Sequence, residues 1–215
     1  MTDKVGVCSR RLVSSVLCVV VVGMLGATRV VAQTAPMDHE HHHDHAAMMA
    51  AALKRSEANY RIPALSLLRQ DGKTVRFPAE LDDGRAVMLQ FIYTSCTAIC
   101  PVTTRTFAQV QDALGKDSAK LHMVSISIDP EYDTVARLDS YAKKLGAAAQ
   151  WQFYTGTLQD SVTLQKSFDV FRGDKMNHVP VTYLRLAPGK PWVRLDGLAS
   201  ADETVKQYRA LVAAK

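Results

Sequence analysis

Hydrophobic and polar positions follow a succession of short regular patterns over most of the chain. Apolar residues in 65–68 and 75–77 flank Asp71-Gly72, a pair typical of a tight turn, so these segments are predicted to form a hairpin. Residues 86–93 are almost continuously apolar, which predicts a buried central strand. Residues 121–128 alternate between apolar and polar and predict a second core strand.

Helical spacing and capping residues predict four helices between and after these strands. They begin at Pro101, at Asp133 or Thr134, at Thr157 with Asp160, and at the capping box formed by Ser200 and Glu203. A short strand at 151–154 and a second hairpin, 181–186 with 192–195, complete the pattern.

The order of these elements predicts an α/β fold. It runs hairpin, strand, helix, strand, helix, strand, helix, hairpin, helix, which indicates a mixed central sheet with helices on both faces. A cysteine motif follows the first central strand, and this placement is typical of a thioredoxin-like fold, here with an added N-terminal β-hairpin. We expect residues 56–215 to form this one domain.

The first 32 residues have the composition of an export signal. Lys4, Arg10 and Arg11 precede a mostly apolar run, and small residues at 30–32 predict cleavage near Gln33. The apolar run is shorter than the roughly 20 residues that span a bilayer, which favours a cleaved signal over a retained anchor. We therefore expect a periplasmic protein, either soluble or anchored to the inner membrane by its N-terminal segment.

Charge excludes a nucleic-acid partner. The whole chain has 26 basic and 21 acidic residues and a pI of about 9.0. Four of the basic residues and one acidic residue lie in the export signal, which leaves 22 basic against 20 acidic residues. The remaining chain carries no basic stripe of the kind that binds nucleic acid. Contact with a membrane is expected only if the N-terminal segment is retained.

Residues 33–55 are predicted to form a flexible linker rich in histidine and methionine. They contain too little apolar surface to pack. Imidazole and thioether groups together suit copper, so one interpretation is an accessory copper-gathering segment; the other is a solvated spacer. The candidate accessory ligands are His39, His41, His42, His43 and His45.

Cys96 and Cys100 are the only cysteines left once the export signal is removed. They lie where a strand gives way to a helix, and a proline is favoured at the first helical position. Pro101 there would place Cys100 beside the free N–H groups of the helix, which predicts that the Cys100 thiolate is favoured. A bridge over so short a loop stabilises little, so we interpret the pair as a working one, for metal binding or thiol exchange. Two soft thiolates select Cu(I) or Zn(II).

The predicted domain contains two histidines. His122 lies at the start of a core strand and is interpreted as structural. His178 lies in the polar loop 174–180, where an imidazole is free to point into a site, so metal ligand and plain surface residue both stay open. A cis peptide bond between Val179 and Pro180 is an additional hypothesis.

Three motifs, in order, resemble those of the Sco (SenC) family of copper-handling proteins. They are the strand followed by Cys-x-x-x-Cys-Pro at 91–101, the strand ending in Asp-Pro-Glu-x-Asp-Thr at 125–134, and His178 ahead of Tyr183-Leu184. The resemblance implies that Cys96, Cys100 and His178 bind copper, as Cu(I) or Cu(II). It further implies a copper chaperone that serves cytochrome c oxidase at its dinuclear copper site. An oxidase subunit would then receive the copper, and another periplasmic copper carrier is a second candidate partner.

The sequence departs from the family pattern at two positions. Thr97 stands where the family commonly has proline, and Asn177 stands where an acidic residue commonly precedes the histidine. Neither change removes a ligand. The acidic residues Asp129, Glu131 and Asp133 are interpreted as helix-capping residues rather than copper ligands.

Enzymatic activity stays open at this point. The principal alternative is a thiol-disulfide reductase that acts on the cysteines of a target copper site, with Cys96 and Cys100 as its catalytic redox dithiol. A peroxidase of the same fold would require a proline where the chain has Tyr93. We therefore favour a metallochaperone over an enzyme.

Overall fold

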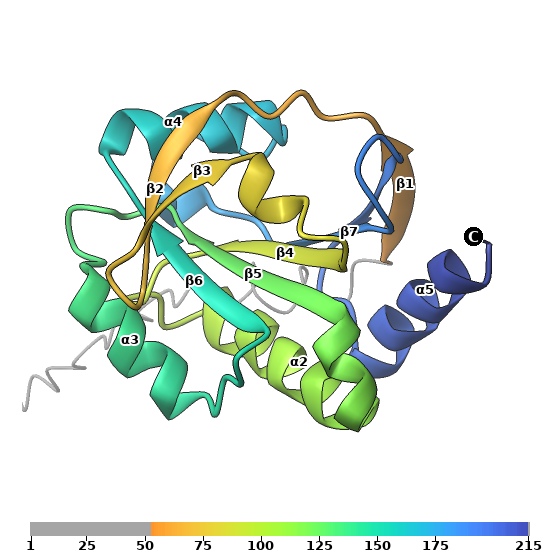
Figure 1. Ribbon diagram of the computed structural model, residues 1–215. Helices are drawn as coiled ribbons and strands as arrows, with labels where there is room; N and C mark the ends of the chain where they lie inside the picture. The colour runs from red at the N-terminus through yellow and green to blue at the C-terminus, as the bar shows by residue number, and fades with distance from the viewer. Residues whose placement is uncertain (1–52, 215) are drawn as a thin grey trace, which may run out of the picture. The chain divides into compact units, whose positions relative to one another are not determined.

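A computed structural model describes residues 53–214, which form an eight-stranded mixed sheet with helices on both faces (Figure 1). The strands lie in the order β1-β8-β7-β4-β5-β6-β2-β3. Their bounds are β1 Lys54–Ala58, β2 Leu65–Arg69, β3 Thr74–Phe77, β4 Ala86–Ile92, β5 Leu121–Ser127, β6 Trp151–Thr155, β7 Val181–Arg185 and β8 Trp192–Asp196. The predicted α/β, thioredoxin-like architecture is confirmed.

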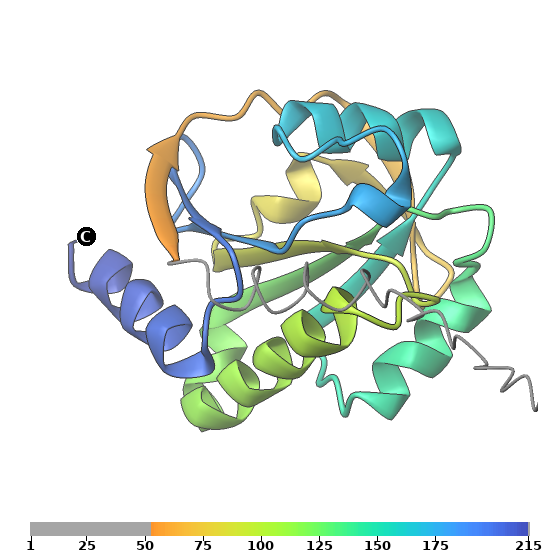
Figure 2. The same ribbon diagram turned by 180° about the vertical axis from the view of Figure 1, so that it is seen from behind.

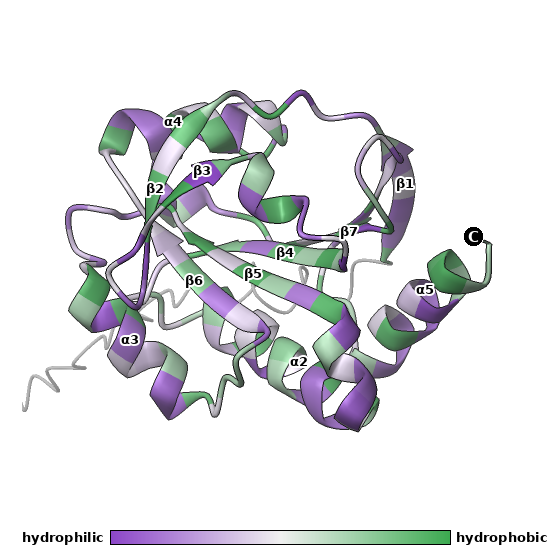
Figure 3. Cartoon of the chain, viewed as in Figure 1, coloured by the Kyte–Doolittle hydropathy of each residue, from purple (hydrophilic) through white to green (hydrophobic). Residues whose placement is uncertain are grey.

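The centre of the sheet is formed by β4, which is almost continuously apolar, and by β5, in which apolar and polar positions alternate. β4 and β5 run parallel, β6 continues the parallel set, and β7 pairs antiparallel with the other edge of β4. Every residue of β4 and β5 is buried, because helices and loops cover both faces of the sheet there. Figure 3 shows hydrophobic stretches along these strands, interrupted by hydrophilic positions, and hydrophilic positions on the outer turns of the helices.

The α-helices divide unequally between the two faces. Figures 1 and 2 show α2, α3 and α5 on one face and α4 on the other. Their bounds are α2 Ile99–Leu114, α3 Val135–Lys144, α4 Leu158–Ser167 and α5 Ala201–Ala213. Three short 3-10 helices complete the described elements: η2 Ala79–Leu81, η3 Gly115–Lys120 and η4 Lys175–Asn177.

The predicted hairpins and most of the predicted caps are confirmed. β2 pairs with β3, and β7 pairs with β8, in antiparallel register. The side chains of Thr134, Thr157 and Ser200 accept backbone N–H groups at the starts of α3, α4 and α5. The three side chains fix the starts of these helices, because each accepts a backbone N–H that the first turn of a helix leaves without a partner.

Two features differ from the expectations. β1 was not predicted; it begins at Lys54, two residues before the expected domain boundary, and pairs with β8. The cis peptide bond in the described residues joins Phe77 to Pro78, so the hypothesis of a cis bond between Val179 and Pro180 is wrong. The predicted export signal and nearly all of the predicted linker, including its five histidines, lie outside the described residues. Between residues 53 and 214, none of the helices has the length and apolar character needed to cross a bilayer.

Candidate functional site

The cysteine turn connects the end of β4 to the start of α2. α2 begins at Ile99, so Pro101 is the third helical residue and not the first. The backbone N–H of Cys100 therefore points back and donates to the sulfur of Cys96, with an N···Sγ distance of 3.4 Å. The two cysteines form no disulfide and are buried, with 8% of Cys96 and 1% of Cys100 exposed. Two sulfurs thus share one helix N-terminus.

This arrangement makes Cys96 the thiolate of the pair. A hydrogen bond from the Cys100 thiol lowers the pKa of Cys96 to about 4, aided by the Cys100 backbone N–H and the Tyr93 hydroxyl and opposed by burial. The shared proton and burial raise the pKa of Cys100. The prediction that Cys100 carries the thiolate is wrong, because the helix begins two residues earlier than Pro101 implied.

Asp133 holds the cysteine turn in place. This fully buried carboxylate accepts hydrogen bonds from the backbone N–H and hydroxyl of Thr94 and from the hydroxyl of Ser127. It thereby ties the turn to the end of β5. Burial raises the pKa of Asp133 despite these donors. The capping interpretation of Asp133 is wrong, because Thr134 caps α3.

His178 approaches the same end of β4 from the loop that precedes β7. Its Nε2 lies 3.0 Å from the carbonyl oxygen of Phe91, and the residue is 9% exposed. Because a carbonyl only accepts hydrogen bonds, Nε2 carries the proton and Nδ1 carries a free lone pair. Nδ1 is buried without a hydrogen-bond partner among the described residues. Burial lowers the pKa of His178, which favours the neutral ring that a metal requires.

The loop that carries His178 is fastened beside the cysteine turn. The ammonium of Lys175 pairs with the carboxylate of Asp129, in the loop after β5. The sulfur of Met176 lies 3.8 Å from the hydroxyl of Tyr93, the first residue of the cysteine turn. Asp129 therefore positions the His178 loop, a role that sequence reasoning missed because its partner lies 46 residues further along the chain.

The three predicted ligands meet at one edge of the sheet but do not form a finished metal cluster. In residues 53–214, no set of three His, Cys, Asp or Glu side chains converges closely enough to hold a metal ion. Nε2 of His178 is hydrogen-bonded to the carbonyl oxygen of Phe91, and the backbone N–H of Cys100 is hydrogen-bonded to the sulfur of Cys96. Joint coordination therefore requires a local movement that brings the two sulfurs and Nδ1 of His178 together.

His122 lies in a separate polar cluster. Its Nε2 is 3.1 Å from both the Gln152 side-chain oxygen and the Tyr154 hydroxyl, and Nδ1 is 3.3 Å from the Asp83 carboxylate. The ring is 1% exposed. This environment fits the structural interpretation that the sequence suggested.

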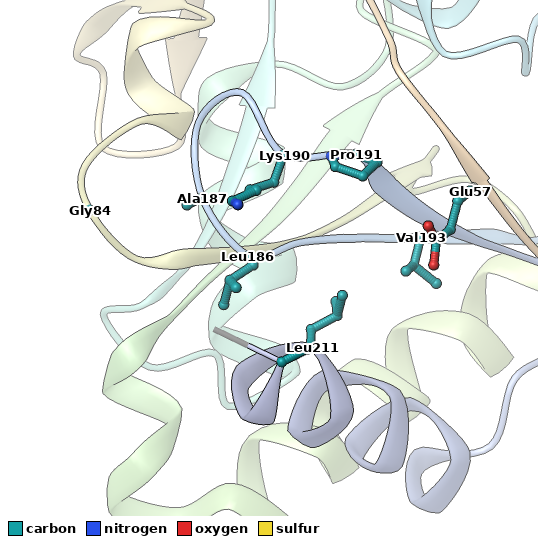
Figure 4. Close-up of a pocket in the computed structure, with 9 residues that line it drawn as sticks. Glu57, Gly84, Leu186, Ala187, Lys190, Pro191, Val193 and Leu211 are labelled. Atoms are coloured by element: carbon teal, nitrogen blue, oxygen red, sulfur yellow. The ribbon is translucent and has the colours of Figure 1, made fainter.

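A cavity of about 360 Å³ lies between the β7–β8 turn and the end of α5 (Figure 4). Leu186, Val193 and Leu211 line its apolar part, and neither cysteine nor histidine contributes to it. Since β7 runs antiparallel to β4, this turn lies beside the beginning of β4, whereas the cysteines follow its end. The cavity is not part of the cysteine site.

Comparison with known proteins places these features in a family context. The SCO1/SenC family profile matches residues 54–213. The SCO1 protein homolog of Bacillus subtilis is 30% identical over 105 residues, which cover 48% of this chain and 53% of that protein. The chain thus spans about half the length of this relative. The SCO2-like protein of Rickettsia conorii is 28% identical over 153 residues, which cover 66% of this chain and 73% of that protein.

Solved structures show the same fold. Arabidopsis thaliana ScoI, solved with copper bound, is 26% identical with a TM-score of 0.61 and covers 72% of this chain and 100% of its own. BsSco, described as a member of the Sco family of cytochrome c oxidase assembly proteins, is 26% identical with a TM-score of 0.62 and covers 74% of this chain and 98% of its own. Bradyrhizobium japonicum ScoI, also solved with copper bound, is 25% identical with a TM-score of 0.59 and covers 69% and 98%.

Proposed function

We propose, on the premise that the chain belongs to the SCO1/SenC family, that it is a copper chaperone. Cys96, Cys100 and His178 hold the metal as cargo and pass it to a cuproenzyme, in the first place to the dinuclear copper site of cytochrome c oxidase. The copper-bound ScoI structures and the oxidase-assembly role of the BsSco family support this cargo and this recipient.

The state of the His178 ring is the observation that carries the proposal. A metal-binding histidine commonly donates its second ring nitrogen to a carbonyl or carboxylate, which fixes the tautomer and orients the ring. Here Nε2 already donates to Phe91, and Nδ1 is buried with an unshared lone pair. A buried polar atom without a partner costs free energy, and a metal ion beside the two sulfurs would remove that cost.

The cysteine pair supplies the remaining ligands. Cys96 is a thiolate before the metal arrives, and Cys100 gives up its proton when it coordinates. Two thiolates and one imidazole suit Cu(I), and three ligands leave one side open. An incoming thiol of the recipient can therefore displace the ligands one at a time, without any change in the oxidation state of copper.

Cellular location belongs to the same proposal. Residues 1–32 would direct the chain to the periplasm. The protein would be soluble there if these residues are cleaved and anchored to the membrane if they are retained. There the linker histidines His39, His41, His42, His43 and His45 would act as accessory ligands that gather copper near the domain.

A thiol-disulfide reductase is the second candidate, and the low pKa of Cys96 favours it. The Cys96 thiolate would attack a target disulfide and form a mixed disulfide, releasing one target thiolate. Cys100 would then lose its proton and attack Cys96. This step leaves a Cys96–Cys100 disulfide and a fully reduced target, so two electrons pass to the target.

Titration with Cu(I) against a chelator of known affinity separates the two candidates. We expect the reduced wild type to bind a single Cu(I) tightly and His178→Ala to bind it at least about tenfold more weakly, because a ligand is lost. The reduction potential of the dithiol should stay unchanged in this variant.

The matched control replaces the five linker histidines with asparagine. It should retain the tight Cu(I) site and lose only copper that is bound more weakly. Equal affinity of wild type and His178→Ala would contradict the ligand role of His178. If the wild type holds no copper tightly yet rapidly reduces disulfides, the reductase is correct.

A further inference from the structure

We infer that Met176 is the entry ligand for Cu(I), the thioether that receives the ion before it reaches the cysteines. This role rests on the proposed copper-chaperone function and extends it to the path by which the metal enters. Three observations on the described residues carry it: the exposure of Met176, the way its loop is fixed, and its position relative to Cys96.

Met176 is far more exposed than other large apolar side chains in residues 53–214. Its side chain is 73% exposed, and the next is Leu158 at 52%. Leaving an apolar side chain in water forgoes about 25 cal/mol of stabilisation for each Å² of apolar surface that burial would have removed from water. The fold tolerates this cost directly beside the cysteine turn, where a thioether has a chemical use that an aliphatic side chain lacks.

The loop holds Met176 in this position. The carboxylate of Asp174 accepts the backbone N–H of Met176, with an O···N distance of 2.8 Å, and starts the short helix η4. Lys175, which lies between Asp174 and Met176, forms an ion pair with Asp129. Met176 is therefore exposed on a segment that polar contacts of the two preceding residues hold in place.

One hydroxyl connects the thioether to the thiolate. The hydroxyl of Tyr93 lies 3.8 Å from the sulfur of Met176, and the same hydroxyl is near enough to Cys96 to help lower the pKa of its thiol. His178 follows Met176 by two residues and contacts the carbonyl oxygen of Phe91, near the end of β4. An exposed thioether and a buried thiolate thus lie beside the same tyrosine hydroxyl.

The ligand chemistry gives this path a direction. A neutral thioether binds Cu(I) and has little affinity for Zn(II) or Cu(II), so it selects the ion at the mouth of the site. The donor's ligand leaves copper as the Met176 sulfur binds. The Cys96 thiolate then displaces the thioether, and Cys100 coordinates as its proton passes to water. No electron moves, and copper stays Cu(I) throughout.

Stopped-flow loading of the full-length reduced protein from the Cu(I) complex of bicinchoninate tests this role. Met176→Leu keeps an apolar side chain of similar size but removes the sulfur. We expect it to take up Cu(I) about tenfold more slowly than wild type, the lower end of the effect of losing a group beside a metal site. The final copper content should be the same. Leu158→Ala, a change at the second most exposed apolar side chain, should load at the wild-type rate.

The rate at which iodoacetamide alkylates Cys96 shows whether Met176 acts as a copper ligand or only controls access to the cysteines. If Met176→Leu alters alkylation as much as it alters loading, Met176 only controls access and the inference is overturned. It is also overturned if Met176→Leu loads copper at the wild-type rate, while the chaperone proposal stands. If wild type takes up no Cu(I), both proposals fail together.

Discussion

Replacing Cys96 or Cys100 with serine is expected to lower the affinity for Cu(I) by more than about 100-fold, which exceeds the usual effect of changes outside the ligand set. Serine keeps the size of the side chain but offers a hydroxyl that stays protonated and is a hard donor, poorly matched to Cu(I). Each substitution also removes the partner of the remaining sulfur, because the two cysteines share one proton. Competition with a Cu(I) chelator measures the loss.

Thr97→Ala is the matched control for both cysteine variants. Thr97 lies between the cysteines, is exposed, and contributes no ligand to the proposed site. Its replacement should leave the Cu(I) affinity within a small factor of wild type. Wild-type affinity in either serine variant would contradict a two-thiolate site, whereas an equal loss in Thr97→Ala would attribute the effect to the shape of the turn.

The second large effect is expected for Asp133→Ala. The substitution leaves the backbone N–H and hydroxyl of Thr94 and the hydroxyl of Ser127 without their buried acceptor. Unsatisfied buried donors cost about 1–3 kcal/mol each when water cannot replace the partner, so we expect a loss of about 3 kcal/mol in the free energy of unfolding. For a domain of this size, the melting temperature should fall by about 9 °C.

Thermal unfolding of Asp133→Ala beside Asp139→Ala checks this effect. Asp139 is also an aspartate but forms an exposed pair with Lys143 on α3, so its loss should cost less than about 0.5 kcal/mol. Asp133→Ala should additionally weaken Cu(I) binding, because the turn that carries Cys96 loses its anchor. A melting temperature equal to that of Asp139→Ala would show that Asp133 does not hold the turn.

Much of the fold could be predicted because its signals are local. The continuous apolar run of β4, the Asp71-Gly72 turn and the Ser200 cap each depend on residues a few positions apart. β1 could not be predicted in this way. Its sequence, Lys-Arg-Ser-Glu-Ala, has no buried face, and only pairing with β8 makes it a strand.

The sequence motifs drew attention to three residues that lie near one another in the folded chain, but they did not reveal which cysteine has the lower pKa. The motifs named Cys96, Cys100 and His178, yet the position of the thiolate depends on whether α2 begins at Ile99 or Pro101, a difference of two residues. Helix starts are uncertain by this amount from sequence alone.

The supports of the site depend on partners far apart in the chain. The contact from Asp133 to Thr94 spans 39 residues, and that from Lys175 to Asp129 spans 46. Since no local pattern encodes such contacts, their roles became visible only in the folded chain.

Nitrogen NMR of the His178 ring, recorded on reduced protein with and without Cu(I), reports whether this ring binds the metal. We expect Cu(I) to shift the Nδ1 resonance strongly, while Nε2 keeps its proton and its bond to Phe91. An Nδ1 resonance that does not change while copper occupies the cysteines would contradict this expectation, because His178 would then take no part in holding the metal.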